Sequence, residues 1–503
     1  MSTLNETLIR DVVSDVLNQL GTPDDTSAPA ESPCACGKAE CTCNQDPGSC
    51  GCGGKTAPGD GKHGVFTSAE QAAAAAADAF EALRLQGFEG RAKVVNIVKT
   101  ICADKSVEWG ELEFAETRIG RLEHKVTKLE GIPAIPGTEW IQPYGMSGDR
   151  GITMEEHTPF GVIGAITPVT HSIPTIACNI INMVAAGNTV VFNAHPSGAR
   201  CAAEAIRTFN RAIEQEIGIP NVVTIIEEPS IESFNDICKN EHIALMCVTG
   251  GPAVVDAAMK SGKRSICAGP GNPPVVVDET ARIDQAAEDI IFGGGFDNNL
   301  LCIGEKQVFV VDAVYDRFLQ AFEKAGARKL DSQQLATLTS EVFTFSEDDG
   351  GCSHAVLNRE LIGADPCVLA QRAGLSVPED TPLLFAETDA SHVFVIEEQM
   401  TPMIPIIRVP DVHEGIAQAK ISEHGYKHSS MIHSLNVEHM TAMAKALDST
   451  LFIKNGHCLA GLGSGGEGYG SFSIATTTGE GITTPMTFTR KRRCVMVNNL
   501  NQF

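Results

Sequence analysis

The first twenty residues carry apolar side chains at helical spacing. Leucine, isoleucine and valine recur every three or four positions, with acidic, amide and arginine side chains between them. This period predicts an amphipathic helix over residues 1–20. Such a short helix is marginal alone in water, so its apolar stripe must be buried against its own domain or against a partner. The stripe consists of Leu4, Leu8, Ile9, Val12, Val13, Val16, Leu17 and Leu20.

Residues 21–64 lose this periodicity and are rich in Ala, Pro, Gly, Ser and Cys, which predicts a flexible linker. Thiolates at the density found here suit Zn²⁺, Cu(I) or an iron–sulfur cluster. Their spacing fits neither a zinc finger nor a ferredoxin. A metal site and a redox-sensitive tether therefore both stay open. The cysteines form three Cys-x-Cys pairs: Cys34, Cys36, Cys41, Cys43, Cys50 and Cys52.

The next pattern is helical and then changes to alternating strands and helices. Ser68 and Gln71 have capping-box spacing before an alanine-rich helix, and helical patterns continue to about Lys105. From Gly161, apolar runs at 161–167, 189–193, 222–226 and 243–249 alternate with helical stretches. A second unit of the same kind starts near Gly269 and includes the run 307–311. Such alternation predicts an α/β fold with parallel sheets covered by helices on both faces.

A different pattern separates the helical part from the first strand. Residues 137–158 alternate loosely and contain the turn Gly148-Asp149-Arg150-Gly151, which predicts a β-hairpin.

Length and charge narrow the class of protein. A chain of 503 residues exceeds one typical core, so two or more domains are expected. The formal net charge of −25 argues against nucleic acid or an anionic membrane as a partner. Seventeen cysteines without a secretory signal fit a reducing compartment. The most apolar stretch, residues 161–192, is interrupted by prolines and asparagines and predicts buried structure in a soluble protein.

Cys302 is the candidate nucleophile. It follows the glycines of residues 293–295, interpreted as a turn, and the polar residues 297–299. Backbone N–H groups in such a loop favour the thiolate, and glycines let the backbone approach a ligand. Asparagines and glycines are expected to line a site rather than fill a core. The alternative is an inert, buried cysteine.

The string from Phe296 to Lys306, Phe-Asp-Asn-Asn-Leu-Leu-Cys-Ile-Gly-Glu-Lys, resembles the active-site loop of the aldehyde dehydrogenase superfamily. It is most similar to the coenzyme-A-acylating branch found in propanediol- and ethanolamine-utilising bacterial microcompartments. The resemblance extends from about Gly64 to the C-terminus. It implies a Rossmann-type nucleotide/CoA-binding domain over residues 65–268 and an α/β catalytic domain over 269–483.

The resemblance also implies that the protein forms an oligomer and binds to a microcompartment. The hairpin 137–158 and a strand within 484–503 would form an oligomerisation element of a homo-oligomer, a dimer or tetramer. Residues 1–20 look like an encapsulation peptide, which binds microcompartment shell or core proteins through its apolar face. The expected location is therefore the lumen of a microcompartment in the bacterial cytoplasm.

In the implied chemistry, Cys302 attacks the aldehyde to form a thiohemiacetal, and its backbone N–H stabilises the oxyanion. Close relatives supply a second donor from an asparagine, but His171 occupies that position here. An imidazole N–H can donate one hydrogen bond, more strongly if protonated, although a packing role for His171 stays open.

Hydride transfer would leave a thioester on Cys302. The glutamate that activates water in hydrolytic relatives falls on Ala268, so water attack should be slow and coenzyme A favoured. His428 resembles a histidine that assists thiol exchange, and here too a packing role stays open.

The implied cofactor is NAD. The segment from Val248 to Gly251 predicts the end of a strand that leads into a helix, where a phosphate group can bind backbone N–H groups. No Gly-x-Gly-x-x-Gly fingerprint is present. Glu398 resembles the residue that hydrogen-bonds the nicotinamide ribose. The ribose-side segment lacks a lysine for a 2′-phosphate, so NAD is preferred over NADP. The expected cofactor-binding residues are Thr167, Pro168, Asn193, His195, Pro196, Thr249, Gly250, Gly251, Gly269 and Glu398.

The sequence thus predicts an NAD-dependent, coenzyme-A-acylating dehydrogenase of a short-chain aldehyde such as propionaldehyde or acetaldehyde. Two alternatives remain. One is a hydrolytic aldehyde dehydrogenase that gives the free acid, and the other is a scaffold or metal-binding component of a microcompartment.

Overall fold

The structure is a computed structural model that describes residues 61–347 and 353–500. The helix predicted over residues 1–20 and the linker cysteines lie outside the described residues, so those predictions are not tested by it.

A six-stranded parallel sheet forms the first half of the described chain, in the order β1-β6-β5-β4-β7-β8. The chain runs outward from β4 to β5 and β6, and then returns to the other side of β4 as β7. The carboxyl ends of β4 and β7 therefore flank the point where the strand order reverses, the usual ligand-binding position in such sheets. The strands are β1 (Val65–Phe66), β4 (Val162–Thr167), β5 (Thr189–Ala194), β6 (Val223–Ile226), β7 (Ile243–Thr249) and β8 (Ser265–Ala268).

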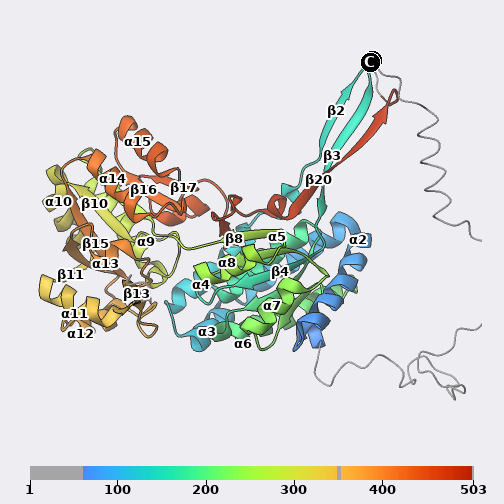
Figure 1. The fold of residues 1–503 in the computed structure, drawn as a ribbon, viewed down its shortest axis with the longest axis horizontal. Coiled ribbons are helices and arrows are strands. Elements are labelled where there is room, and N and C mark those ends of the chain that lie inside the picture. The colour runs from blue at the N-terminus through green and yellow to red at the C-terminus, as the bar shows by residue number, and fades with distance from the viewer. Residues whose placement is uncertain (1–60, 348–352, 501–503) are drawn as a thin grey trace, which may run out of the picture. The chain divides into compact units, whose positions relative to one another are not determined.

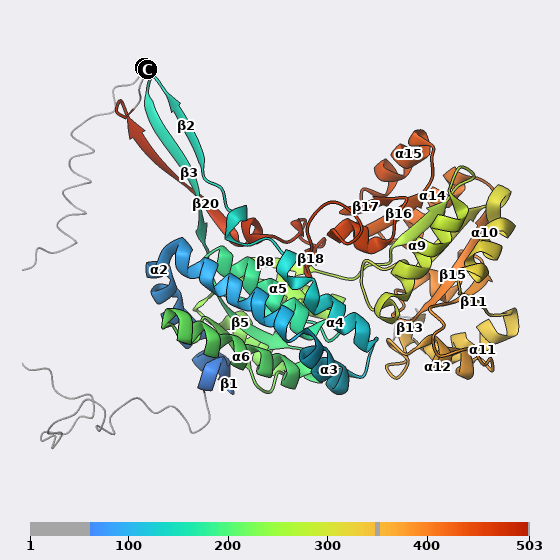
Figure 2. The same ribbon diagram turned by 180° about the vertical axis from the view of Figure 1, so that it is seen from behind.

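Helices cover both faces of this sheet, as the α/β pattern predicts. Helix α2 (Ala69–Asp104) packs against α5 (Ser172–Ala185) and α6 (Ala199–Ile217), while α7 (Ile231–Lys239) and α8 (Pro252–Lys260) lie on the opposite face (Figures 1 and 2). The Ser68 hydroxyl accepts the Gln71 N–H at the start of α2. Helices α3 (Ser106–Thr117) and α4 (Leu122–Glu130) pack against each other. Within the described residues, no helix is long and apolar enough to cross a membrane.

A second parallel sheet has seven strands in the order β11-β14-β15-β10-β9-β16-β17. Helices α9 (Ile283–Gly295) and α10 (Asp312–Lys324) cover one face, and α14 (Val412–Ser422) and α15 (Val437–Leu447) cover the other. Helices α11 (Ser332–Val342), α12 (Pro366–Arg372) and α13 (Val393–Ile396) pack near the β14 edge. The strands are β9 (Pro274–Val277), β10 (Gln307–Val311), β11 (Arg328–Lys329), β14 (Leu384–Thr388), β15 (Met403–Val409), β16 (Ser429–His433) and β17 (Leu451–Lys454).

Three antiparallel strands form a separate small sheet, in which β2 (Tyr144–Gly148) and β20 (Thr489–Val497) lie on either side of β3 (Gly151–Pro159) (Figure 1). The hairpin predicted at residues 148–151 is therefore present. It begins later than predicted because residues 138–140 form a 3₁₀ turn, and β20 likewise begins after the 3₁₀ turn of residues 485–488. Two further strand pairs are short: β12 (Phe343–Glu347) with β13 (Ser353–Leu357), and β18 (Ile474–Ala475) with β19 (Gly481–Ile482).

Candidate active site

Three predicted site residues, together with Gly271, precede four neighbouring strands of the second sheet. Glu398 precedes β15, Cys302 precedes β10, Gly271 precedes β9 and His428 precedes β16. These strands are adjacent in the order β15-β10-β9-β16 and are parallel, so their amino ends share one edge of the sheet. A side chain on Gly271 would place its Cβ 2.7 Å from the Cys302 carbonyl oxygen and 2.9 Å from the His428 ring. The structure therefore brings Cys302, Glu398 and His428 together, with Gly271 between the thiol segment and the imidazole.

The loop that carries Cys302 is tied at both ends by Asn299 and Lys306. The Asn299 side-chain amide donates to the carbonyl oxygen of Glu305 (2.9 Å). The Lys306 ammonium, fully buried, donates to the Asn299 carbonyl (2.7 Å), the Asn299 side chain (2.8 Å) and the Gln399 carbonyl (3.0 Å). All three ammonium hydrogens are used, and the last bond ties the loop to the segment that carries Glu398.

Three consecutive residues before Cys302 have left-handed backbones: Asp297 (φ 49°), Asn298 (φ 53°) and Asn299 (φ 61°). Each costs roughly 1 kcal/mol or less, since Asn and Asp tolerate this region better than other side chains. Their side chains are fully buried and bond within the protein, so they hold the loop in shape, and that the asparagines also line the site stays a prediction. They turn inward because their polar atoms have partners there. The Asn298 amide, for example, donates to the carbonyl of Gly363 and to the carboxylate of Asp365, both at 2.9 Å.

The glycines of residues 293–295 form the last turn of helix α9, so the prediction of a glycine-rich turn is wrong. Their role is close packing. A Cβ on Gly293 would clash with the Glu305 carboxylate, and one on Gly294 would clash with Ile404. The absence of side chains lets the end of α9 press against the catalytic loop and strand β15.

Burial raises the pKa of the Cys302 thiol to about 12, and the negative charge of Glu398 adds to this effect, whereas the Lys306 ammonium opposes it. At neutral pH the thiol is therefore protonated, and its nucleophilic form requires a proton acceptor. Burial also raises the pKa of Glu398, against the Lys306 charge and the N–H of Gly271, which donates to this carboxylate.

His428 is suited to accept a proton. Burial, followed by the Lys306 charge, lowers the pKa of its imidazole to about 4, so the ring is neutral at pH 7. Its Nδ1 lies 2.9 Å from the Ser429 hydroxyl, and its backbone N–H donates to Glu423 (2.9 Å). Its Nε2 is buried and has no hydrogen-bond partner among the described residues. An unpaired buried polar atom costs roughly 1–3 kcal/mol, and this nitrogen is free to accept a hydrogen bond from a substrate.

His171 lies where β4 leads into α5, and only 8% of its surface is exposed. Its Nδ1 is 3.3 Å from the Lys128 ammonium, and the Phe472 ring is 5.9 Å from its own ring. Burial, together with the charges of Lys128 and Lys125, holds the pKa of His171 well below its usual range. The ring is therefore neutral, and the stronger donation expected from a protonated form does not apply.

All the predicted cofactor-binding residues except Glu398, which precedes β15 of the second sheet, gather at the carboxyl ends of the first sheet. The Thr167 hydroxyl is buried without a partner among the described residues. A Cβ on Gly251, at the start of α8, would meet nothing within 4 Å, which leaves phosphate groups free to approach the helix terminus. These features fit a dinucleotide. Thr167 and Pro168 follow β4, Asn193, His195 and Pro196 end or follow β5, Thr249, Gly250 and Gly251 end or follow β7, and Gly269 follows β8.

The carboxylate position of hydrolytic relatives, Ala268, is the last residue of β8 and is 5% exposed. Its methyl group offers no base for water.

Among the described residues, one group of side chains comes close enough to share a metal ion: Asp278, Glu279 and His439. The Asp278 carboxylate already accepts hydrogen bonds from Thr280, Ser434 and His439, so this group is explained as a structural network.

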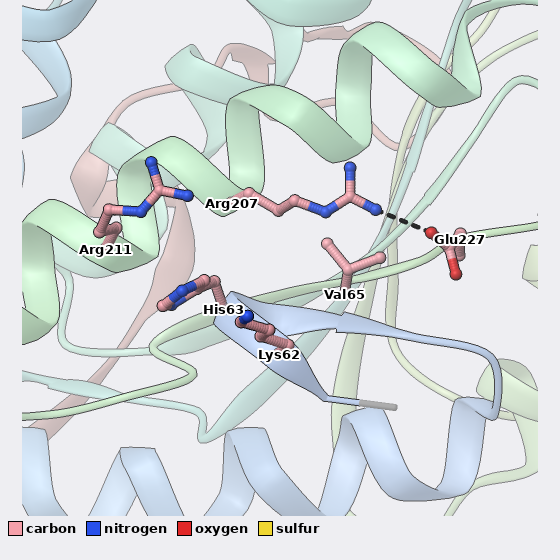
Figure 3. Close-up of a pocket in the computed structure, with 6 residues that line it drawn as sticks. All are labelled: Lys62, His63, Val65, Arg207, Arg211 and Glu227. Carbon is pink, nitrogen blue, oxygen red and sulfur yellow. Dashed lines mark hydrogen bonds and ion pairs between the residues drawn. The ribbon is translucent and has the colours of Figure 1, made fainter. Parts of the chain in front are cut away.

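A pocket of about 320 Å³ lies beside β1 and α6 rather than at Cys302 (Figure 3). Its charges are largely paired within the protein, since Arg207 bonds to Glu227 (2.7 Å) and His63 lies 3.9 Å from Glu214. We assign it no part in the chemistry.

Lys306, Lys128, Lys125 and Asp297 are the site residues that the sequence reasoning missed. Lysines at helical spacing, such as Lys125 and Lys128, usually lie on the solvent-exposed face of a helix. Lys306 belongs to the string that resembles the active-site loop, but no role was predicted for it. A possible signal was the placement of Lys125 and Lys128 beside Leu122 and Leu129 on one face of α4.

The profile of the aldehyde dehydrogenase family matches residues 61–471. The acetylating acetaldehyde dehydrogenase EutE of Salmonella typhimurium is 40% identical over 437 residues, which cover 86% of this chain and 92% of EutE.

Two solved structures are also similar. A propionaldehyde dehydrogenase of Rhodopseudomonas palustris, with bound CoA and an acylated cysteine, is 39% identical with a TM-score of 0.84, covering 88% of this chain and 100% of that chain. A propionaldehyde dehydrogenase from the fucose utilisation microcompartment of Clostridium phytofermentans is 40% identical with a TM-score of 0.83, covering 87% and 99%.

Proposed function

The chain belongs to the aldehyde dehydrogenase family, and from this premise we propose that it is an NAD-dependent, coenzyme-A-acylating dehydrogenase of a short-chain aldehyde, propionaldehyde or acetaldehyde. The observation that carries the proposal is the row of Glu398, Cys302, Gly271 and His428 along one edge of the second sheet. This row provides a nucleophile and a neutral base, while Ala268 provides no base for water.

In the first half of the reaction, Cys302 loses its proton and its sulfur forms a bond to the aldehyde carbon. Glu398 and His428 are the neighbouring groups that can accept that proton, and the buried Lys306 ammonium stabilises the thiolate. The oxyanion is stabilised by the backbone N–H of Cys302 and by a ring N–H of His171.

The residues at the carboxyl ends of β4, β5 and β7 would hold NAD, which would supply a hydride acceptor when bound. Glu398 would hydrogen-bond the nicotinamide ribose. No lysine follows Asn193 in the segment to Pro196, which supports NAD over NADP as the cofactor.

In the second half, the thioester on Cys302 meets coenzyme A. His428 Nε2 takes the proton of the incoming thiol, a bond forms between the coenzyme A sulfur and the acyl carbon, and the bond from Cys302 to that carbon breaks. The buried position of the imidazole keeps it neutral and ready for this step.

Enzyme mixed with NAD and propionaldehyde but no coenzyme A is expected to give a burst of about one NADH per site, followed by a slow rate, because Ala268 cannot activate water. Adding coenzyme A should restore steady turnover and yield propionyl-CoA. Absorbance of NADH and mass spectrometry of the product measure both phases. Sustained formation of propionate without coenzyme A would instead support the hydrolytic alternative.

We further infer a homo-oligomer assembled through the small antiparallel sheet. Its exposed apolar side chains support this, since Tyr144 (63% exposed), Val495 (55%) and Val497 (60%) face outward in the single chain.

The protein is proposed to reside in a microcompartment lumen, with residues 1–20 binding a shell or core protein. A reporter fused to residues 1–20 is then expected to enter microcompartments. Leu8→Glu with Val12→Glu should prevent this by placing charges on the apolar stripe, whereas Asn5→Glu with Asp15→Asn, on the polar positions, should not. Co-purification with shells measures the effect, and equal recovery of both double variants would contradict the proposal.

A further inference from the structure

Helix α4 carries a buried ammonium whose three hydrogens all have acceptors. Lys128 Nζ lies 2.5 Å from the Asp297 carboxylate, 3.2 Å from the Thr170 carbonyl oxygen and 3.3 Å from Nδ1 of His171. The side chain is 4% exposed and Asp297 is fully buried. Lys128 therefore joins the loop that carries Cys302 to the segment that carries His171.

The contact with His171 has a chemical consequence. An ammonium group has no lone pair and can only donate, so His171 Nδ1 must accept the hydrogen bond. A neutral imidazole that accepts at Nδ1 carries its single hydrogen on Nε2. The same positive charge opposes protonation of the ring. Lys128 thus selects one tautomer, whose free N–H is at the opposite side of the ring.

The charges around Lys128 are balanced and rigidly held. Lys125 Nζ lies 3.2 Å from Glu113 and donates to the same Thr170 carbonyl (2.8 Å). The second oxygen of Glu113 accepts the N–H of Ile173, at the start of α5 (2.9 Å). Two lysines thus face two carboxylates, and their bonds join α3, α4, the segment 170–173 and the loop that carries Cys302. A network of this kind holds one geometry when all its members are satisfied.

We propose that Lys128 is a positioning residue for the reaction. It fixes the Nε2–H tautomer of His171 and holds that ring in register with Cys302, so that the ring N–H is ready as an oxyanion donor. This inference rests on the proposed aldehyde oxidation at Cys302 but not on the fate of the acyl group.

The test replaces Lys128 by methionine, which keeps the length of the side chain and removes its donors. The ring nitrogens of His171 are observed by ¹⁵N NMR of the full-length protein labelled at histidine, with His171→Gln to assign the signals. Wild-type protein should show a protonated Nε2 and an accepting Nδ1, and Lys128→Met should show a mixture of tautomers. Lys324→Met, an exposed lysine on α10 (80% exposed), should leave the signals unchanged.

The kinetic readout is the rate of the NADH burst without coenzyme A. Lys128→Met should slow it by about 10- to 100-fold, within the range for an impaired oxyanion donor, with a KM for aldehyde within about threefold of wild type. Lys128→Arg, which retains a charged donor, should recover part of the rate. In a His171→Ala background, Lys128→Met should cost little more, because both changes remove the same interaction.

If Lys128→Met fails to fold, the charge-balanced variant Lys128→Met with Asp297→Asn removes the donor without leaving a buried, unpaired carboxylate. An unchanged His171 tautomer in the variant that folds, or an equal loss of rate in the His171→Ala background, would overturn the proposal. Both readouts precede the step that uses coenzyme A, so a failure of the acylating assignment would leave them interpretable.

Discussion

Cys302→Ser is expected to lower the NADH burst and steady aldehyde oxidation by about 10⁴-fold or more, the scale seen when a nucleophile is removed. Serine keeps the size of the side chain and the backbone N–H of residue 302, so the oxyanion contact and the loop survive. What is lost is the thiolate, because a hydroxyl ionises far less readily than a thiol, even beside Glu398 and His428.

Absorbance of NADH measures this loss, and fluorescence titration with NAD tests the cofactor site, which lies on the other sheet and should bind NAD as in the wild type. The control is Cys494→Ser, an exposed thiol on β20, which should retain full activity. Substantial turnover by Cys302→Ser would remove this residue from the nucleophile role.

The second large effect is expected from His428→Gln. Steady turnover with coenzyme A should fall by about 10²- to 10⁴-fold, the usual worth of a general base, while the burst before coenzyme A changes much less. The wild-type imidazole has a pKa of about 4, lowered by burial and by Lys306. Its base form is therefore present above pH 4 and is lost as the pH falls through that value. The acid limb of the coenzyme A step should lie near pH 4 rather than near 6.5.

The chain offers a matched control on the same strand. His433, at the other end of β16, is also buried, its pKa is lowered to about 4 by burial, and its Nε2 is likewise unpaired among the described residues. His433→Gln removes an equally buried ring, so it should lower the melting temperature similarly and spare the coenzyme A step. Equal losses of turnover in both variants would assign His428 to packing.

The sequence predicted β4, β5, β6 and β7 of the first sheet within one residue at each end, because each is a short, mostly apolar run, but it did not predict β1 or β8. The run 243–249 and the run 307–311 became β7 and β10 with the same bounds. The row of Glu398, Cys302, Gly271 and His428, the catalytic row, could not be predicted. These residues meet at one edge of the sheet because of the spatial order β15-β10-β9-β16, which no local sequence pattern reveals.

The incorrect prediction about the loop before Cys302, and the failure to predict Lys128, have a common physical cause. The glycines of 293–295 and Asn298 have small or polar side chains, which were expected to form a turn that lines a site rather than to fill a core. In the structure the glycines allow a helix end to pack closely, and Asn298 finds its partners inward. Lys128 was overlooked for the same reason, because a polar side chain becomes a core residue only when tertiary partners satisfy it.

The four members of the catalytic row come from segments far apart in the chain, at residues 271, 302, 398 and 428, and meet only because their strands pair. No short segment of the polypeptide contains all four residues. Each strand between β15 and β16 must find its neighbours before the thiol, the carboxylate and the imidazole meet, and such non-local pairing forms late in folding. Acyl transfer therefore reports on the completed sheet: a chain in which one of these strands is mispaired is expected to lack this activity, even if its helices have formed.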